Sequence, residues 1–202
     1  MATPADHRAD HPSEHPDTTP PPIAPDDKNW TWVLERRCPD CGFDAESVTV
    51  AAVPDLVRAN AADWADLLAH PHARQRPRPS QWSALEYACH VRDVFRLFET
   101  RLRLMLTEDG PSFANWDQDV TAVEHRYDLQ DPAVVADEVQ AAAASVAAAF
   151  AGIRPDQYGR TGFRSDGAAF TVESFARYFV HDPVHHVDDV RRGNAVLERS
   201  PA

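Results

Sequence analysis

The chain has 202 residues, which is the length of one domain with a tail rather than of two full domains. Its 20 basic residues are outnumbered by 32 acidic ones, and the resulting formal net charge of -12 disfavours binding to nucleic acid and to anionic membranes. We therefore expect no nucleic-acid and no membrane partner. We see no apolar run as long as a membrane span and no signal-peptide pattern, which predicts a cytoplasmic protein.

Residues 1–27 form an acidic, Pro-rich segment that we expect to be a disordered tail. They hold seven of the 17 prolines, six acidic side chains and a single basic one. With almost no apolar side chain to bury, such a segment cannot offset its ordering entropy. His7, His11 and His15 are spaced by four, but the prolines between them oppose a continuous helix, so a solvated tail is favoured over a metal-binding tract.

Four later segments carry the apolar periodicity of amphipathic helices. Pro54 suits the first turn of the first one, and Ser83 with Glu86 gives the second a capping box. In the third, Asp131 is a typical N-cap residue and Pro132 suits the first helical position. The helices are expected to span about residues 54–70, 83–109, 132–152 and 171–193.

The rest of the chain consists of connections between these helices. Residues 160–163 and 168–170 flank Ser165-Asp166-Gly167 and predict a short β-hairpin before the last helix. Residues 108–130 predict a long crossover, so the expected fold is an all-α four-helix bundle whose functional site lies between facing helices. We divide the chain into a tail (1–27), an extension with a Cys-x-x-Cys motif (28–50), the bundle (51–195) and a C-terminal tail (196–202).

Three histidines are candidate metal ligands. His181 and His185 are four residues apart, so their side chains lie one helical turn, ~5.4 Å, apart on one face. His90 lies at the edge of the apolar stripe of the second helix and could complete a three-histidine site with an open position, as in catalytic metal sites. His186 is rotated by ~100° from His185 and is not expected to join them. A pair of histidines on a solvated helix face is the alternative.

The three cysteines are too few for a disulfide framework. Cys89 is expected in the helix core, whereas Cys38 and Cys41, in Cys-Pro-Asp-Cys-Gly, resemble a zinc knuckle. Four interpretations stay open: half a zinc site completed by other histidines such as His70 and His72, a redox pair, ligands of the metal of the bundle, or a structural turn with two reduced thiols.

The sequence resembles a known family in three places. These are residues 82–93 (WSALEYACHVRD), the Arg-x-Asp-Gly hairpin that leads into residues 170–174, and the closing pair His181-x-x-x-His185. Together they resemble the DinB/YfiT-like metalloenzyme superfamily. The resemblance covers roughly residues 50–192. It implies an up-up-down-down-like bundle that holds a divalent metal, often zinc or nickel, on His90, His181 and His185.

The resemblance also implies an activity. Better characterised relatives use a low-molecular-weight thiol, such as mycothiol or bacillithiol, in transferase or isomerase reactions. The Ala- and Arg-rich composition is typical of a high-GC bacterium, in which mycothiol would be the cosubstrate. The expected partners are thus a small-molecule thiol or an electrophile, and a homodimer is compatible with the sequence. A non-catalytic metal-binding helical module with a structural or stress-related role is the alternative function.

Three further residues are candidates for a substrate rim. Trp116, Arg160 and Arg164 lie in connections expected at one end of the bundle, where they could close over a substrate or bind its carboxylate. The alternative is that Trp116 anchors the crossover and that the arginines pair with the surplus acidic side chains.

Overall fold

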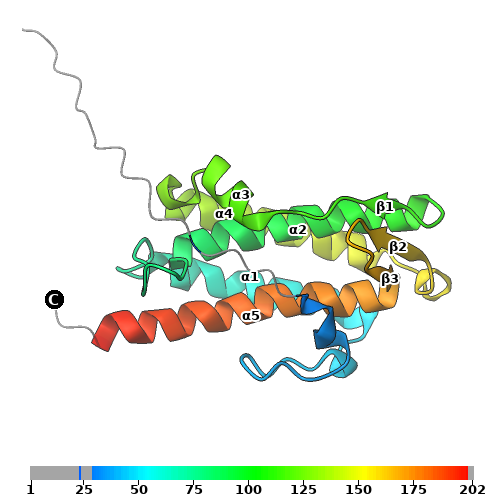
Figure 1. Cartoon of the computed structure of the whole chain (residues 1–202), viewed down its shortest axis with the longest axis horizontal. Helices are drawn as coiled ribbons and strands as arrows, with labels where there is room; N and C mark the ends of the chain where they lie inside the picture. Colours follow the sequence, from blue (N-terminus) through cyan, green and yellow to red (C-terminus); the bar gives the residue numbers. More distant parts are fainter. Residues whose placement is uncertain (1–22, 24–28, 200–202) are drawn as a thin grey trace, which may run out of the picture.

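The structure is a computed structural model that describes residue 23 and residues 29–199 (Figure 1). Four long helices form a bundle, as the sequence predicts. They are α1 (Val53–Ala69), α2 (Ala84–Thr107), α4 (Pro132–Ala151) and α5 (Val172–Arg199). The predicted tail and its three spaced histidines lie outside the described residues, apart from residue 23.

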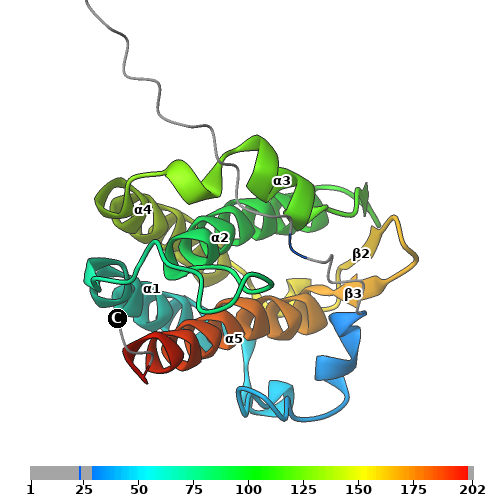
Figure 2. The same ribbon diagram turned by 60° about the vertical axis from the view of Figure 1, so that its left-hand side comes forward.

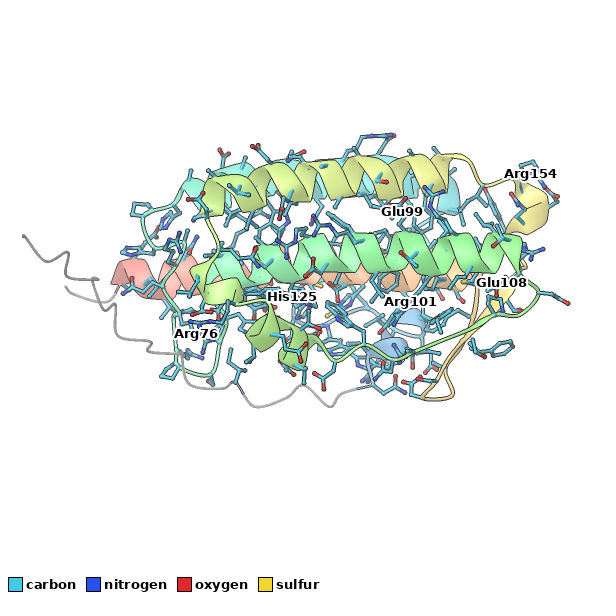
Figure 3. The ribbon with its side chains drawn as sticks, turned by 90° about the horizontal axis from the view of Figure 1, so that it is seen from above. Arg76, Glu99, Arg101, Glu108, His125 and Arg154 are labelled. Atoms are coloured by element: carbon cyan, nitrogen blue, oxygen red, sulfur yellow. The ribbon has the colours of Figure 1, made fainter. Side chains whose placement is uncertain are left out.

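The predicted helix starts are confirmed by their caps. The Ser83 side chain accepts a hydrogen bond from the Glu86 N–H, and the Glu86 carboxylate accepts one from the Ser83 N–H, which completes the capping box. Arg76 from the preceding linker also binds the Glu86 carboxylate, with Nε–Oε2 at 2.9 Å (Figure 3). Asp131 caps α4 by accepting from the N–H groups of the two residues that follow Pro132.

The predicted end of the last helix is wrong. α5 continues past Gly193 to Arg199, into the segment assigned to a C-terminal tail. Gly193 is buried within the helix, and a Cβ at this position would lie 3.1 Å from Pro77 Cγ. The glycine therefore allows the Pro-rich linker to approach α5 closely and does not cap the helix.

The helix directions correct the up-up-down-down expectation. α1 and α5 run parallel, because Asn60 Nδ2 donates to the Pro183 carbonyl while Asp63, further along α1, pairs with Arg191. α2 and α4 also run in one direction and lie side by side in Figures 1 and 3. α5 is antiparallel to α2 in these views, so the order of directions is up, down, down, up.

A long crossover makes the parallel pair possible. After α2 the chain returns along the bundle through β1 (Ser112–Phe113), α3 (Gln118–Glu124) and η4 (Tyr127–Leu129) before α4 begins (Figure 2). The crossover was predicted, whereas β1 and α3 within it were not. A two-residue strand and a seven-residue helix are too short to give a clear periodic pattern.

The predicted hairpin forms and joins β1 in a small sheet. β2 (Thr161–Arg164) pairs antiparallel with β3 (Ala169–Thr171), with Gly162 opposite Phe170. β1 pairs with β2 in parallel, which gives the order β1-β2-β3. A Cβ at Gly162 would lie only 2.7 Å from Met105 Cγ, so glycine lets this strand pack against the end of α2.

The core of the bundle is aromatic between α2, α4 and α5. Phe95 and Phe98 of α2 contact Phe179 with ring centroids 5.9 and 4.9 Å apart, and Phe150 of α4 stacks on the other side of Phe179. Among the described helices, α4 is the one long and apolar enough to cross a membrane by length and composition. Its apolar face packs against the rest of the bundle, as in the core helix of a helical protein.

The extension before α1 is part of this core. It contains three short 3-10 helices, η1 (Trp30–Leu34), η2 (Ala45–Ser47) and η3 (Val50–Ala52). Val33, Cys38 and Val48 are buried. Arg177 and Arg192, from well-separated turns of α5, donate to the backbone carbonyls of Val48 and Asp40. The extension therefore lies along α5.

Candidate functional site

The structure separates the three predicted histidines into two clusters of potential metal ligands on neighbouring faces of α5. His90 of α2 meets Asp182 and His186, whereas His181 and His185 meet Cys38 and Cys41. In each cluster one donor atom per residue can be chosen so that all lie within 4.8 Å of one another. The predicted set of His90, His181 and His185 is thus not brought together.

The His90 cluster is built from facing positions of two antiparallel helices. Asp182 and His186 are four residues apart on α5 and share one helix face, which is directed toward α2. The Asp182 Oδ1 atom lies 3.4 Å from His90 Nε2 and 3.7 Å from His186 Nε2. Nitrogen and oxygen donors bound to one tetrahedral ion at ~2.0–2.2 Å lie ~3.4 Å apart, so these separations suit a shared divalent cation.

Unpartnered polar atoms support this assignment. The His90 side chain is completely buried, and neither ring nitrogen has a hydrogen-bond partner among the described residues. The Asp182 Oδ1 atom is also buried and accepts no hydrogen bond. Buried polar groups are nearly always satisfied, so a set of unpartnered nitrogen and oxygen atoms that face one another fits a metal ion as the missing partner.

Charge and hydrogen bonding prepare the donors for ligation. Burial alone would raise the pKa of Asp182, but attraction to His90 and His186 outweighs it and lowers the pKa to about 2, so the carboxylate is ionised at neutral pH. The Asp189 carboxylate accepts from His186 Nδ1 at 3.1 Å. This bond sets the tautomer in which Nε2 carries no proton, which is the form that can ligate a cation.

Aromatic rings hold the two imidazoles in place. Trp116 stacks on His90 with ring centroids 5.2 Å apart and an interplanar angle of 7°, and its Nε1 donates to Thr121. Trp82 contacts another side of His90 at 5.3 Å, and Tyr87 packs on His186 at 4.9 Å. Trp116 therefore lies against a candidate ligand, closer to the site than the rim at which we expected it.

A cavity of about 440 Å³ opens next to the cluster. Asp182, His186 and Asp189 are in its wall, together with His181 and His185. Four aromatic side chains line it: Trp30, Trp82, Tyr87 and Tyr178. The His90 cluster offers three protein ligands beside an open space, which is the arrangement typical of catalytic metal sites.

The second cluster joins the extension to the neighbouring face of α5, ~100° around the helix axis. The Cys38 Sγ atom lies 3.6 Å from His185 Nδ1, and both cysteines are free thiols. Burial and the neighbouring His185 lower the pKa of His181 to about 4, and burial raises the pKa of Cys41 to about 11. His181 is thus a neutral imidazole at neutral pH.

The histidines that we considered as partners of the cysteines lie elsewhere. The His70 and His72 rings face each other at 5.4 Å, and His70 pairs with Glu198 near the end of α5. The expectation that they complete a cysteine site is therefore not met. Instead, the cysteines meet the pair His181 and His185.

The two arginines proposed for a substrate rim are engaged in the fold. Arg160 Nε donates to the Met105 carbonyl at 2.6 Å, which places it at the end of α2 far from His90. Arg164 pairs with Asp166 at 2.7 Å and donates to the Tyr178 hydroxyl at 3.1 Å. The alternative, that the arginines pair with acidic side chains, describes Arg164, whereas Arg160 binds backbone carbonyls instead.

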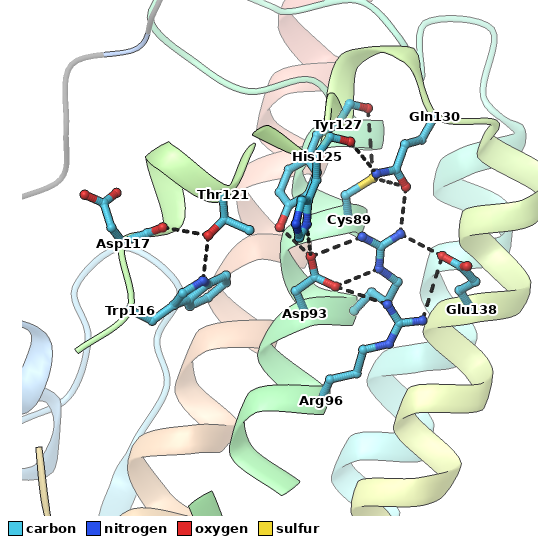
Figure 4. A network of polar contacts seen from close by, with 11 residues as sticks. Cys89, Asp93, Arg96, Trp116, Asp117, Thr121, His125, Tyr127, Gln130 and Glu138 are labelled. Atoms are coloured by element: carbon cyan, nitrogen blue, oxygen red, sulfur yellow. Dashed lines mark hydrogen bonds and ion pairs between the residues drawn. The ribbon is translucent and has the colours of Figure 1, made fainter. Parts of the chain in front are cut away.

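A buried polar network lies beside the His90 cluster on α2 (Figure 4). Asp93 accepts from the Tyr127 hydroxyl at 2.6 Å and pairs with Arg92 and Arg96. The Asp93 carboxylate is largely buried, with 14% of its side chain exposed. Cys89 is buried in the core as predicted, with its Sγ atom 3.4 Å from Gln130 Oε1.

The fold and the donor clusters together define a class of protein, a four-helix bundle with candidate metal sites between its helices. Comparison with known proteins identifies the family: the model of the DinB superfamily matches residues 54–190, and the chain belongs to this superfamily. No match was found among curated proteins.

A solved structure shares the fold. YfiT from Bacillus subtilis superposes with a TM-score of 0.70 at 17% sequence identity, over 77% of this chain and 93% of that one. YfiT is described as a probable metal-dependent hydrolase with an unusual four-helix bundle topology.

Sequence reasoning missed two residues of the His90 cluster, Asp182 and His186. The signal was present, because these residues have the same four-residue spacing as His181 and His185. We treated His186 as rotated out of the site, which is correct relative to His185. The spacing does not reveal which face of α5 points to α2.

Proposed function

We propose that the chain is a divalent-metal-dependent enzyme whose catalytic ion, zinc or nickel, is held by His90, Asp182 and His186. The proposal rests on one observation: three donor side chains, His90 fully buried and two of them with unpartnered buried atoms, converge beside a cavity. In this ligand set Asp182 and His186, which face His90, take the places that we predicted for His181 and His185.

The residues around these ligands have distinct tasks. An ion bound there would act as a Lewis acid and lower the pKa of a thiol or a water molecule that reaches its open position. Asp189 holds the His186 ring through its Nδ1–H, and Trp116 covers the face of His90. Trp82 packs on His90 from another direction and limits access of water to the ligands.

The walls of the cavity favour a polar, uncharged or cationic ligand. Ser80, Gln81 and Gln118 offer hydrogen-bonding groups, while Asp119 and Asp189 supply negative charge. The one arginine of the wall, Arg192, is already paired with Asp188 and Asp189. Hydroxyl-rich molecules bind well where aromatic faces and hydrogen-bonding side chains alternate.

We therefore propose a thiol of the mycothiol type as the cosubstrate, in transfer or isomerisation reactions with a small electrophile. Its sugar and cyclitol hydroxyls match the polar and aromatic wall of the cavity. Hydrolysis is the second candidate, and the observation that favours it is the likeness of the fold to YfiT. Both candidates use the same three metal ligands. The nucleophile is the thiol in the first candidate and a water molecule in hydrolysis.

The first experiment measures metal and activity together. The purified full chain is loaded with zinc or nickel and incubated with epoxide, haloalkane and ester substrates, in the presence of mycothiol, of cysteine and of no thiol. We expect turnover that requires metal and mycothiol, and its loss in His90→Ala and His186→Ala. His125→Ala, which removes an exposed imidazole outside both clusters, is the matched control and keeps full activity.

Each other outcome has a defined meaning. Ester cleavage without thiol, lost in the same two variants, would replace thiol transfer by hydrolysis. A wild type that shows no turnover but melts at a much lower temperature after chelation would support the non-catalytic module. Unchanged metal content in His90→Ala and His186→Ala would contradict the assignment of the catalytic site.

A further inference from the structure

The extension presents its two cysteines on a tight turn. The Cys38 N–H donates to the Phe43 carbonyl at 2.8 Å, and the Gly42 N–H donates to the Cys38 carbonyl at 2.9 Å. Gly42 has a φ of 75°, which a residue with a side chain rarely adopts. Turns of this kind place two thiolates on one side, as in zinc knuckles.

The turn faces two imidazoles on α5. His181 and His185 share the helix face that lies against the extension, and the four donor atoms lie within 4.8 Å of one another. In a tetrahedral zinc site with bonds of ~2.3 Å to sulfur and ~2.0 Å to nitrogen, a sulfur and a nitrogen ligand lie ~3.5 Å apart. The Cys38 Sγ atom is 3.6 Å from His185 Nδ1.

The burial and packing around the two cysteines and two histidines fit a bound metal ion better than an ordinary hydrophobic core. Cys38, His181 and His185 are 1%, 4% and 8% exposed, and His181 Nε2 is buried without a hydrogen-bond partner. Trp30 and Phe43 pack on the imidazoles at 5.2–5.5 Å between ring centroids and form an apolar shell. A buried imidazole nitrogen with no partner is costly unless something binds it.

The ligand count separates this cluster from the one that contains His90. Two cysteines and two histidines fill a tetrahedral coordination sphere, which is the composition of structural zinc sites, whereas three ligands leave an open position. The second nitrogen of His185, Nε2, lies 3.5 Å from Asp189 Oδ2, so the carboxylate orients Nδ1 toward the cysteines.

We propose that Cys38, Cys41, His181 and His185 form a structural zinc site, distinct from the catalytic one, that fastens the extension 29–50 to α5. The site adds a metal cross-link to the hydrogen bonds from Arg177 and Arg192 that hold this segment against α5. It does not depend on the activity assigned to the His90 cluster.

Metal analysis and cobalt substitution test the site. The full chain should bind two equivalents of zinc, and the cobalt form should show thiolate-to-cobalt charge-transfer absorption, which histidine and carboxylate ligands do not give. The double variant Cys38→Ser, Cys41→Ser should lose one equivalent and this band. Cys89→Ser, which changes a buried cysteine outside both clusters, is the matched control and should keep both.

A second measurement tests the site without the double variant. If the double variant does not fold, X-ray absorption of the zinc-loaded wild type replaces it, and two sulfur neighbours at ~2.3 Å are expected. The proposal is overturned by a cobalt form without the thiolate band, by zinc with no sulfur neighbour, or by a Cys38–Cys41 disulfide that binds no zinc after reduction. His90→Ala should lose the other equivalent and keep the band; if it loses no metal, the catalytic assignment fails while the structural site stands.

Discussion

Asp189 lies between the two clusters and provides the sharpest test of both. Its carboxylate accepts from His186 Nδ1 at 3.1 Å and lies 3.5 Å from His185 Nε2. Arg192 holds the same carboxylate through its other oxygen at 2.7 Å. One side chain therefore orients one ligand in each proposed metal site, so its replacement should weaken both sites at once.

The expected size of the effect follows from these contacts. Removal of a carboxylate that orients a histidine ligand typically costs ~10–100-fold in metal affinity, or about 1.4–2.7 kcal/mol. Asp189→Ala should approach the larger value at the His90 cluster, where the hydrogen bond is shorter. Asp189→Asn keeps an acceptor oxygen of similar size without the charge, so about tenfold is expected.

The assay is a competition for zinc against a chromogenic chelator. In the cobalt form, the thiolate band reports the cysteine site separately from the His90 cluster. Asp63→Asn removes a carboxylate that pairs with Arg191 on the surface of α5 and is the control; it should leave both affinities unchanged. Weakening of one site only, or an equal effect of Asp63→Asn, would refute the shared role of Asp189.

The remaining predictions concern the residues beside the His90 cluster. Trp116→Leu removes the ring stacked on His90 and should raise the dissociation constant for metal at that cluster several-fold, measured in the same competition, while the thiolate band stays unchanged. Tyr127→Phe deletes the hydrogen bond to Asp93 and should lower the free energy of unfolding by ~1.5–3 kcal/mol in urea titrations; no loss would mean that the arginines alone satisfy the carboxylate. Burial alone would raise the pKa of Asp93, but hydrogen bonds from Arg92 and Tyr127 lower it below the ordinary 3.8. The stability that Asp93 contributes is therefore present above pH 3.8 and lost as the pH falls through the folded pKa, and Asp93→Asn should lack this part of the acid dependence of the melting temperature.

The four helices of the bundle could be predicted because the residues that mark a helix start lie within a few positions of one another in the sequence. Pro54, the Ser83 capping box and the Asp131 cap mark three helix starts within a residue or two. Gly193 misled the same reasoning, because a glycine that allows close packing looks like a glycine that ends a helix. The direction of each helix depended on how the crossover returns, which no local pattern encodes.

The candidate site was predictable in its residue types but not in its grouping. His90 and the cysteines were singled out as candidate ligands from their surroundings in the sequence, with other roles left open for the cysteines. Which histidine meets which partner depends on the rotation of α5 about its axis, and adjacent residues such as His185 and His186 point to different neighbouring segments. Trp116 is in a long connection, so only the three-dimensional path of the crossover shows that it reaches His90.

The position of α5 in the chain has a consequence for biosynthesis. Cys38 and His185 are 147 residues apart in sequence, and α5 supplies two residues of each cluster. Contacts of such high sequence separation form late, because a long loop must close first. The cysteines therefore emerge from the ribosome well before the histidines that face them. Neither cluster can be completed until α5 docks, so metal uptake should coincide with the last stage of folding, and the unpaired thiols are exposed to oxidants until then.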